Sequence, residues 1–223
     1  MEKIVVANHK MNLDLNEIKD FISKTKGKQV IVCPTSIYTS YFIDGGIVTG
    51  LQNIYHEDFG AYTGEISPKQ AKSLGIDYAI IGHSERRTVF KEDNNIINKK
   101  IKKALENGLK VIFCIGEKLN EDYKVVLENQ ITEGLNNIQE EIIVAYEPVW
   151  SIGTGKIPTN EDIIKVTNYI KEFFSYEVKV LYGGSVNTSN INTLNEVKEV
   201  SGYLIGGAST NADELIKIIE VVS

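Results

Sequence analysis

Residues 77–116, DYAIIGHSERRTVFKEDNNIINKKIKKALENGLKVIFCIG, contain one complete repeat of the architecture that this sequence predicts. Two short runs rich in Ile and Val, 77–83 and 109–116, flank a segment, 94–107, whose apolar residues recur at helical spacing. The two runs lack a clean alternation of apolar and polar residues, which is typical of parallel strands buried on both faces. Gly108 follows the helical segment as a C-terminal stop. This stretch is therefore predicted to fold as strand, helix and parallel strand.

The remainder of the chain continues the same alternation. Six further apolar runs are predicted strands, at 3–9, 29–34, 47–53, 141–147, 177–184 and 201–207. Helices are predicted over 159–173, where Thr159 is a candidate N-cap, and over 211–220, with a less regular pattern over 187–195. The connection at 34–46 is short and poor in helix signals, so the chain looks trimmed there.

Eight strands that alternate with helices predict an α/β fold with a parallel sheet. Eight repeats favour a closed (β/α)8 barrel, the TIM barrel, over an open doubly wound sheet. No linker or low-complexity tract divides the sequence. Residues 1–223 are therefore predicted to form a single (β/α)8 TIM-barrel domain.

Composition narrows the class of protein. The net charge of −6 argues against a nucleic-acid partner, because such proteins usually carry a basic face. Cys33 and Cys114 each end an apolar run, which indicates buried thiols in a reducing compartment. The N-terminal sequence resembles neither a signal peptide nor a membrane span, and no apolar run approaches the roughly 20 residues that a spanning helix needs. A cytoplasmic location without membrane partners is expected.

Candidate catalytic residues follow three of the strands, and active sites of such barrels lie at the carboxyl ends of the strands. Lys10 could hold an anionic substrate, although a solvated lysine is an equally good interpretation. His83 precedes an apparent helix start, which should lower the imidazole pKa and leave a neutral hydrogen-bond donor, although a lone histidine is usually structural. Glu147 emerges beside Pro148 and Trp150, where partial burial would raise its pKa and make it a better base, against the alternative of a solvated glutamate.

Glycine-rich segments suggest a lid and a phosphate site. Residues 151–156, SIGTGK, have the composition of a hinged loop that could close over a substrate, although an ordinary turn would look similar. Gly-Gly pairs follow the last two strands, at 183–184 and 206–207, where these barrels often bind phosphate. Arg86 and Arg87 could also bind phosphate, but ion pairing is the favoured role. No metal-ligand spacing and no dinucleotide fingerprint occur, so no metal or cofactor is predicted.

Seven ordered motifs together resemble the triosephosphate isomerase family, over nearly the whole chain. They are NHKMN (8–12), GAYTGE (60–65), GHSERR (82–87), CIGE (114–117), AYEPVWSIGTGK (145–156), YGGSV (182–186) and GGAS (206–209). The Val-Trp after Glu147-Pro148 places the chain with the bacterial and eukaryotic type, in a shortened form. His9 departs from the family's usual Trp, and Ser151 from a common Ala.

The resemblance implies interconversion of dihydroxyacetone phosphate and D-glyceraldehyde 3-phosphate through an enediolate, in glycolysis and gluconeogenesis. Glu147 would be the general base, neutral His83 the electrophile and Lys10 the electrostatic residue. A Glu base, a neutral His and a closing loop are the established scheme of this family. The substrate would be bound by Asn8, Lys10, Gly153, Ser185, Gly206 and Gly207.

The family also implies a homodimer, in which the loop carrying Thr63 reaches the neighbouring subunit, and it places Glu85 near Lys10. Two alternatives stay open. Another phosphate-binding barrel enzyme, such as a sugar-phosphate epimerase or an aldolase, would share the Gly-Gly sites but lack the set of Lys10, His83 and Glu147. A Schiff-base aldolase would also need a lysine within a strand. The other alternative is a non-catalytic barrel.

Overall fold

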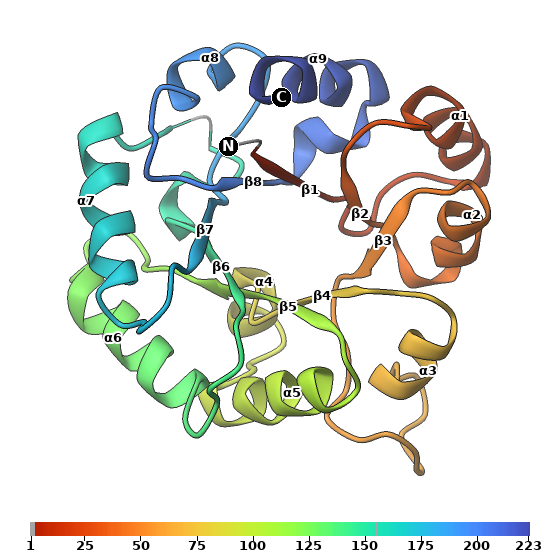
Figure 1. The fold of residues 1–223 in the computed structure, drawn as a ribbon, viewed down its shortest axis with the longest axis horizontal. Helices are drawn as coiled ribbons and strands as arrows, with labels where there is room; N and C mark the ends of the chain where they lie inside the picture. The colour runs from red at the N-terminus through yellow and green to blue at the C-terminus, as the bar shows by residue number, and fades with distance from the viewer. Residues whose placement is uncertain (1–2, 155) are drawn as a thin grey trace.

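The computed structural model describes residues 3–154 and 156–223. Eight parallel strands pair in sequence order, and the last pairs with the first to close a barrel (Figure 1). The strands are β1 (Ile4–Asn8), β2 (Ile31–Cys33), β3 (Val48–Leu51), β4 (Tyr78–Ile81), β5 (Lys110–Ile115), β6 (Ile143–Tyr146), β7 (Lys179–Tyr182) and β8 (Gly202–Ile205). The predicted (β/α)8 TIM barrel is confirmed.

Helices surround this ring of strands (Figure 1). The α-helices are α1 (Leu15–Thr25), α2 (Thr39–Asp44), α3 (Pro68–Ser73), α4 (Ser84–Thr88), α5 (Asn94–Glu106), α6 (Tyr123–Gly134), α7 (Asn160–Lys171), α8 (Ile191–Leu194) and α9 (Ala212–Val222). Short 3-10 turns are η1 (Ser36–Tyr38), η2 (Val149–Ser151) and η3 (Gly207–Thr210). None of the described helices has both the length and the apolar character needed to cross a lipid bilayer.

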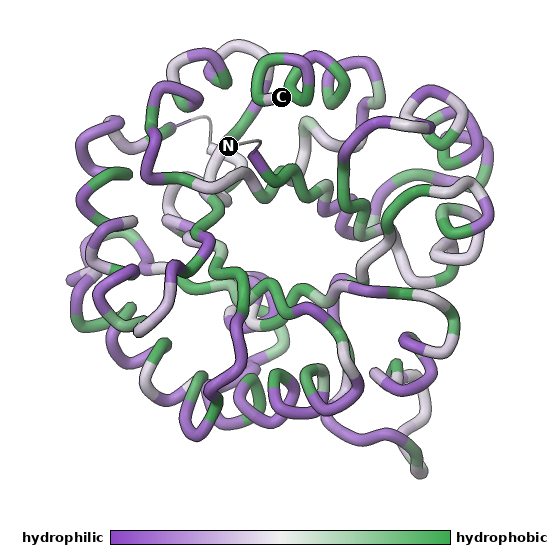
Figure 2. The backbone as a smooth tube through the Cα atoms, viewed as in Figure 1, coloured by the Kyte–Doolittle hydropathy of each residue, from purple (hydrophilic) through white to green (hydrophobic). Residues whose placement is uncertain are grey.

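The apolar runs are strands because both of their faces are buried. One set of side chains fills the barrel interior, and the other packs beneath the helices, so apolar residues line the ring and recur on the inward faces of the helices (Figure 2). The interior set is Val6, Ile31, Cys33, Ile80, Ile112, Cys114, Ala145, Leu181 and Leu204. A strand buried in this way cannot alternate apolar with polar residues, which explains the pattern in the sequence.

Helix ends follow the chemistry of the predicted caps. Thr159 caps α7 in a reciprocal arrangement with Asp162, as expected from the sequence. Gly108 follows α5 with a φ of 73°, a conformation that glycine adopts at little cost. The expected boundaries of the α5 and α7 segments are confirmed to within two residues.

Two connections differ from expectation. The expectation that residues 34–46 are poor in helix is wrong, because η1 runs directly into α2, and burial of Thr39 and Phe42 compensates for the weak helix propensity of this segment. The helix-like pattern at 187–195 yields only the single turn α8. The side chain of Asn187 accepts a hydrogen bond from the amide of Ser189, which offers the backbone a turn in place of a helix.

His9 lies fully buried just after β1. Its ring makes edge contacts with Phe21 of α1 and Phe42 of α2, at centroid distances of 4.6 and 5.7 Å. Neither ring nitrogen has a hydrogen-bond partner among the described residues. Burial lowers the pKa of His9 to about 4. The imidazole is therefore uncharged and packs as an aromatic side chain in the core, next in sequence to Lys10.

The buried His9 should make stability sensitive to acid. The unfolded chain binds a proton on His9 below its ordinary pKa of 6.5, whereas the folded protein stays neutral there until about pH 4. Because the unfolded state binds more protons in this window, stability falls as the pH falls from 6.5 to 4, by up to about 3 kcal/mol. We expect His9→Phe to remove this part of the pH dependence. Urea unfolding at several pH values checks it, and parallel curves for the two proteins would contradict it.

Candidate active site

One cavity of about 330 Å³ lies at the carboxyl ends of the strands, and all the site residues expected from the sequence line it. These residues are Asn8, Lys10, His83, Glu147, Gly153, Ser185, Gly206 and Gly207. They come from the ends of β1, β4, β6, β7 and β8, which are far apart in sequence. The closed parallel barrel brings them together because it directs every strand end to the same rim.

Glu147 follows β6 and is almost completely buried. One carboxylate oxygen, Oε1, lies 3.1 Å from Nε2 of His83, and the other, Oε2, accepts a hydrogen bond of 3.1 Å from the amide of Ser84. Burial raises the pKa of Glu147, but His83, the Ser84 amide and Lys10 together outweigh burial and lower it. The expectation of a raised pKa is therefore wrong for this conformation, in which the carboxylate is fully partnered.

His83 is the N-cap of α4, as the sequence suggested. Its Nδ1 accepts a hydrogen bond of 3.2 Å from the amide of Glu85, so the ring proton belongs on Nε2, which faces Glu147. Burial lowers the pKa of His83, but the Glu147 carboxylate more than reverses this, so the expected lowering is wrong for this conformation. A ligand that separated the two side chains would remove the raising influence and leave the neutral ring that the helix cap supports.

Lys10 follows β1 with its backbone in the left-handed region, at a φ of 52°. Its ammonium lies 2.7 Å from the carboxylate of Glu85, which confirms the expected proximity. A Cβ on Gly206 would lie 3.3 Å from Cε of Lys10, so the glycine loop after β8 runs alongside this side chain. Among the described residues that line the cavity, Lys10 is the one lysine, and it lies next to the glycine-rich rim.

The glycine loops leave little room for side chains. A Cβ on Gly183 would come within 2.9 Å of Cγ of Glu147, and one on Gly184 would collide with the hydroxyl of Tyr182. Ser185 donates from its hydroxyl to the carbonyl of Ser151 at 2.6 Å, which connects the loop after β7 to the segment after β6. Because glycine has no side chain, the backbone N–H groups along this rim can approach an anion closely.

The predicted lid, 151–156, is described apart from Gly155, which lies outside the described residues. Its amino-terminal side is fixed through Glu117, which follows β5 in the CIGE motif. Glu117 Oε1 accepts hydrogen bonds from the indole of Trp150 at 2.9 Å and from the hydroxyl of Tyr146 at 3.1 Å. Burial raises the pKa of Glu117. Sequence reasoning did not single out Glu117 or Ser84, although each follows a predicted strand end.

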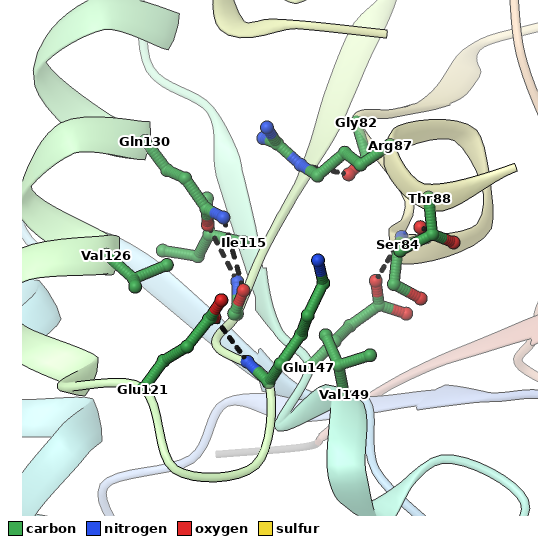
Figure 3. Close-up of a pocket in the computed structure, with 12 residues that line it drawn as sticks. Gly82, Ser84, Arg87, Thr88, Ile115, Glu121, Val126, Gln130, Glu147 and Val149 are labelled. Atoms are coloured by element: carbon green, nitrogen blue, oxygen red, sulfur yellow. Dashed lines mark hydrogen bonds between the residues drawn. The ribbon is translucent and has the colours of Figure 1, made fainter. Parts of the chain in front are cut away.

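A second cavity, of about 250 Å³, lies on the other side of Glu147, between α4 and α6 (Figure 3). The polar side chains at its base are occupied by the protein itself. The side-chain amide of Gln130 accepts a hydrogen bond from the N–H of Gly116 and donates one to its carbonyl. The guanidinium of Arg87 donates hydrogen bonds to the carbonyls of Gly82 and Cys114. Arg86 pairs with Glu92, which confirms the expected ionic role for this residue. For Arg87 that expectation is wrong, because its guanidinium donates to Asn94 and to the two carbonyls and forms no ion pair among the described residues.

Within the described residues, no group of three or more His, Cys, Asp or Glu side chains could hold a metal ion. The carboxylate of Glu147, the imidazole of His83 and the ammonium of Lys10 line the first cavity and are available for chemistry. The carboxylate of Glu214 also lines it, and its Oε1 accepts hydrogen bonds from Thr188. Together with the bare glycine backbone, the first three groups are suited to moving a proton on a small anionic substrate.

The family model described as triosephosphate isomerase matches residues 3–222. The chain is 40% identical to the triosephosphate isomerase of Finegoldia magna over 243 positions, which cover 97% of each chain. It is 41% identical to that of Thermodesulfovibrio yellowstonii, covering 98% of this chain and 99% of the relative, and 42% identical to that of Dictyoglomus thermophilum, covering 98% of each. An alignment of 243 positions exceeds the 223 residues here, so this chain lacks residues that its relatives carry. On these grounds the chain belongs to the triosephosphate isomerase family.

Proposed function

We propose that the protein interconverts dihydroxyacetone phosphate and D-glyceraldehyde 3-phosphate, as its family implies. The observation that carries this proposal is the contact between Glu147 and His83, 3.1 Å apart, in the same cavity as Lys10 and the glycine loops. A base and a neutral acid must both reach neighbouring carbons and oxygens of one small substrate, and this spacing allows it.

The chemical roles follow from what each group can do. Glu147 is ionised and carries no proton, so it can remove one from the carbon next to the carbonyl. His83 carries its proton on Nε2, from which it can donate to the carbonyl oxygen and then exchange a proton with the enediolate. Lys10 stabilises the negative charge that develops, with Asn8 beside it. Gly153, Ser185, Gly206 and Gly207 hold the phosphate through backbone or hydroxyl donors.

The alternatives fit the cavity less well. A Schiff-base aldolase needs a lysine on a strand inside the barrel. Among the described strands, only Lys110 and Lys179 are lysines, and both are exposed at the strand ends opposite the cavity. A non-catalytic barrel would have no need to bury the Glu147 carboxylate against His83, because an ionised carboxylate is costly to bury.

The base is tested by Glu147→Gln, which keeps the shape of the side chain and removes its ability to accept a proton. We expect kcat to fall roughly 10²–10⁴-fold because a positioned general base is lost. A coupled assay with D-glyceraldehyde 3-phosphate measures it. The conservative Glu121→Gln, on an exposed carboxylate outside this cavity, is the control. A kcat for Glu147→Gln within a few-fold of wild type would show that the assignment is wrong.

The segment 151–156 is proposed to close over the substrate and exclude water. In the conformation described here, Trp150 is tied to Glu117 and Ser151 to Ser185. Closure would have to exchange some of these contacts for contacts with the bound substrate. This loop is joined to Glu147 through Pro148 and the short turn η2, so its movement would be coupled to the position of the base.

A homodimer is proposed from large exposed apolar side chains on the loops after β1 to β4. Met11, Ile37, Phe59 and Phe90 are 89, 73, 65 and 60% exposed. The segment between β3 and α3, which carries Thr63, projects beyond the ring of helices (Figure 1). Apolar side chains gathered on one group of loops mark an interaction surface. A second copy of the chain, with the Thr63 loop reaching the neighbouring subunit, is the partner that the family implies.

The homodimer is tested by placing charge on this surface. We expect Met11→Glu together with Phe90→Glu to give a monomer in sedimentation, because a buried unpaired charge opposes association. Leu119→Glu is the control, since Leu119 is 68% exposed but lies on the loop after β5. It should leave the dimer intact. A wild-type chain that sediments as a monomer at micromolar concentration would contradict the proposal.

A cytoplasmic location and a place in glycolysis and gluconeogenesis remain predictions. The location is supported by Cys33 and Cys114, which are both free and buried, as expected in a reducing compartment. The proposed chemistry uses only protein side chains and the substrate. It calls for no metal or cofactor and for no nucleic-acid or membrane partner.

A further inference from the structure

The backbone of Lys10 is held in a conformation that lysine rarely adopts. Its φ of 52° lies in the left-handed region, where a side chain crowds the backbone. Such residues persist only where the surrounding structure determines them from several directions. The source of that constraint is visible in the hydrogen bonds around the two peptide groups that flank this residue.

Both flanking peptides are fixed by side chains. The amide of Lys10 donates to Oδ1 of Asn8 at 3.1 Å, and the carbonyl of His9 in the same peptide accepts from Asn12 at 2.7 Å. The next peptide is held by its carbonyl, that of Lys10. This oxygen accepts from Nε2 of Gln52 at 2.7 Å and from the hydroxyl of Thr35 at 3.1 Å. With both peptide planes fixed, the direction of the Cα–Cβ bond of Lys10 is also fixed.

Gln52 and Thr35 reach Lys10 from neighbouring strands. Gln52 follows β3, and its Nε2 also donates to the carbonyl of Cys33 at the end of β2, at 3.0 Å. Thr35 occupies the N-cap position of η1, yet its hydroxyl makes no capping bond and donates to Lys10 instead. Neither side chain lines the substrate cavity. Any effect of these two residues on the reaction must therefore pass through another residue.

We propose that Gln52 and Thr35 are positioning residues, which hold the Lys10 backbone in its left-handed conformation and so aim the ammonium into the substrate cavity beside Glu85. The proposal rests on the proposed role of Lys10 in the reaction. Its physical basis is that a flexible, strongly hydrated ammonium contributes most when its stem starts from a fixed direction. Without the two donors, the peptide after Lys10 is free to relax toward a common conformation and the ammonium moves away.

The test is a double-mutant cycle with Lys10. Gln52→Met keeps the length of the side chain and removes its N–H donors, and Thr35→Val keeps the shape and removes the hydroxyl. Each is made in the wild-type protein and in a Lys10→Met background. In the wild-type background, where Lys10 is present, we expect each substitution to lower kcat/KM about 10-fold, because a misplaced reacting group contributes less to the reaction. In the Lys10→Met background, each should lower kcat/KM by less than about 2-fold.

Thr25→Val is the control for a merely structural effect. The hydroxyl of Thr25 is buried in α1 and donates to the carbonyl of Phe21 at 2.8 Å, away from the cavity. This variant should lower the melting temperature and leave kcat/KM within about 2-fold of wild type. If Gln52→Met does not fold, Thr35→Val alone decides, because it removes a single oxygen.

Three results would overturn the proposal. The first is an unchanged kcat/KM for folded Gln52→Met and Thr35→Val. The second is an equal loss in both backgrounds, which would show that Lys10 does not mediate the effect. The third is a loss that disappears as the protein concentration is raised, which would trace it to subunit assembly. If Lys10→Met itself retains wild-type kcat/KM, the assigned role of Lys10 fails, and this result is distinct from the other three.

Discussion

Closure of the strand ring by pairing of β8 with β1 is the constraint on which the rest of the structure depends. The pairing brings Gly202 against Ile4 so closely that a Cβ on Gly202 would lie 2.0 Å from the carbonyl oxygen of Ile4. Because every neighbouring pair in the closed ring is parallel, all carboxyl ends share one rim. Asn8, at the end of the first strand, and Gly206, just after the last, become neighbours across the closure because of this single pairing.

The same ring explains how a chain of net charge −6 can offer a site to an anion. The overall field opposes such a ligand, so the attraction has to be local. Lys10 supplies one charge beside the glycine loops, and the bare backbone supplies donors that carry no net charge. The barrel wall also keeps Glu147 and His83 out of water, where their interaction with each other is stronger.

The fold could be predicted from the sequence because the patterns that indicate its strands and helices are local. Continuous apolar runs such as 109–116 mark strands with two buried faces, and the Thr159 cap and Gly108 stop mark helix ends. Lys10, His83 and Glu147 could also be named as candidates from the ends of predicted strands, whereas the substrate-binding residues came from the motifs that resemble the family. What failed was electrostatic: the pKa values of Glu147 and His83 shift in directions opposite to those expected. Each expectation rests on the residue's own strand end, whereas the main cause of each observed shift is the other side chain, which comes from a distant strand and lies 3.1 Å away.

The sequence by itself determined the strand order, the barrel, the family resemblance and the identity of the groups at the rim, since these depend on short-range patterns and on motifs. Only the tertiary structure decided how those groups meet. The contact of Glu147 with His83, the tie of Trp150 to Glu117 and the hold of Gln52 on Lys10 all join residues far apart in the chain. No local pattern encodes such pairs, because their distances are set by the closure of the ring and by the packing around it.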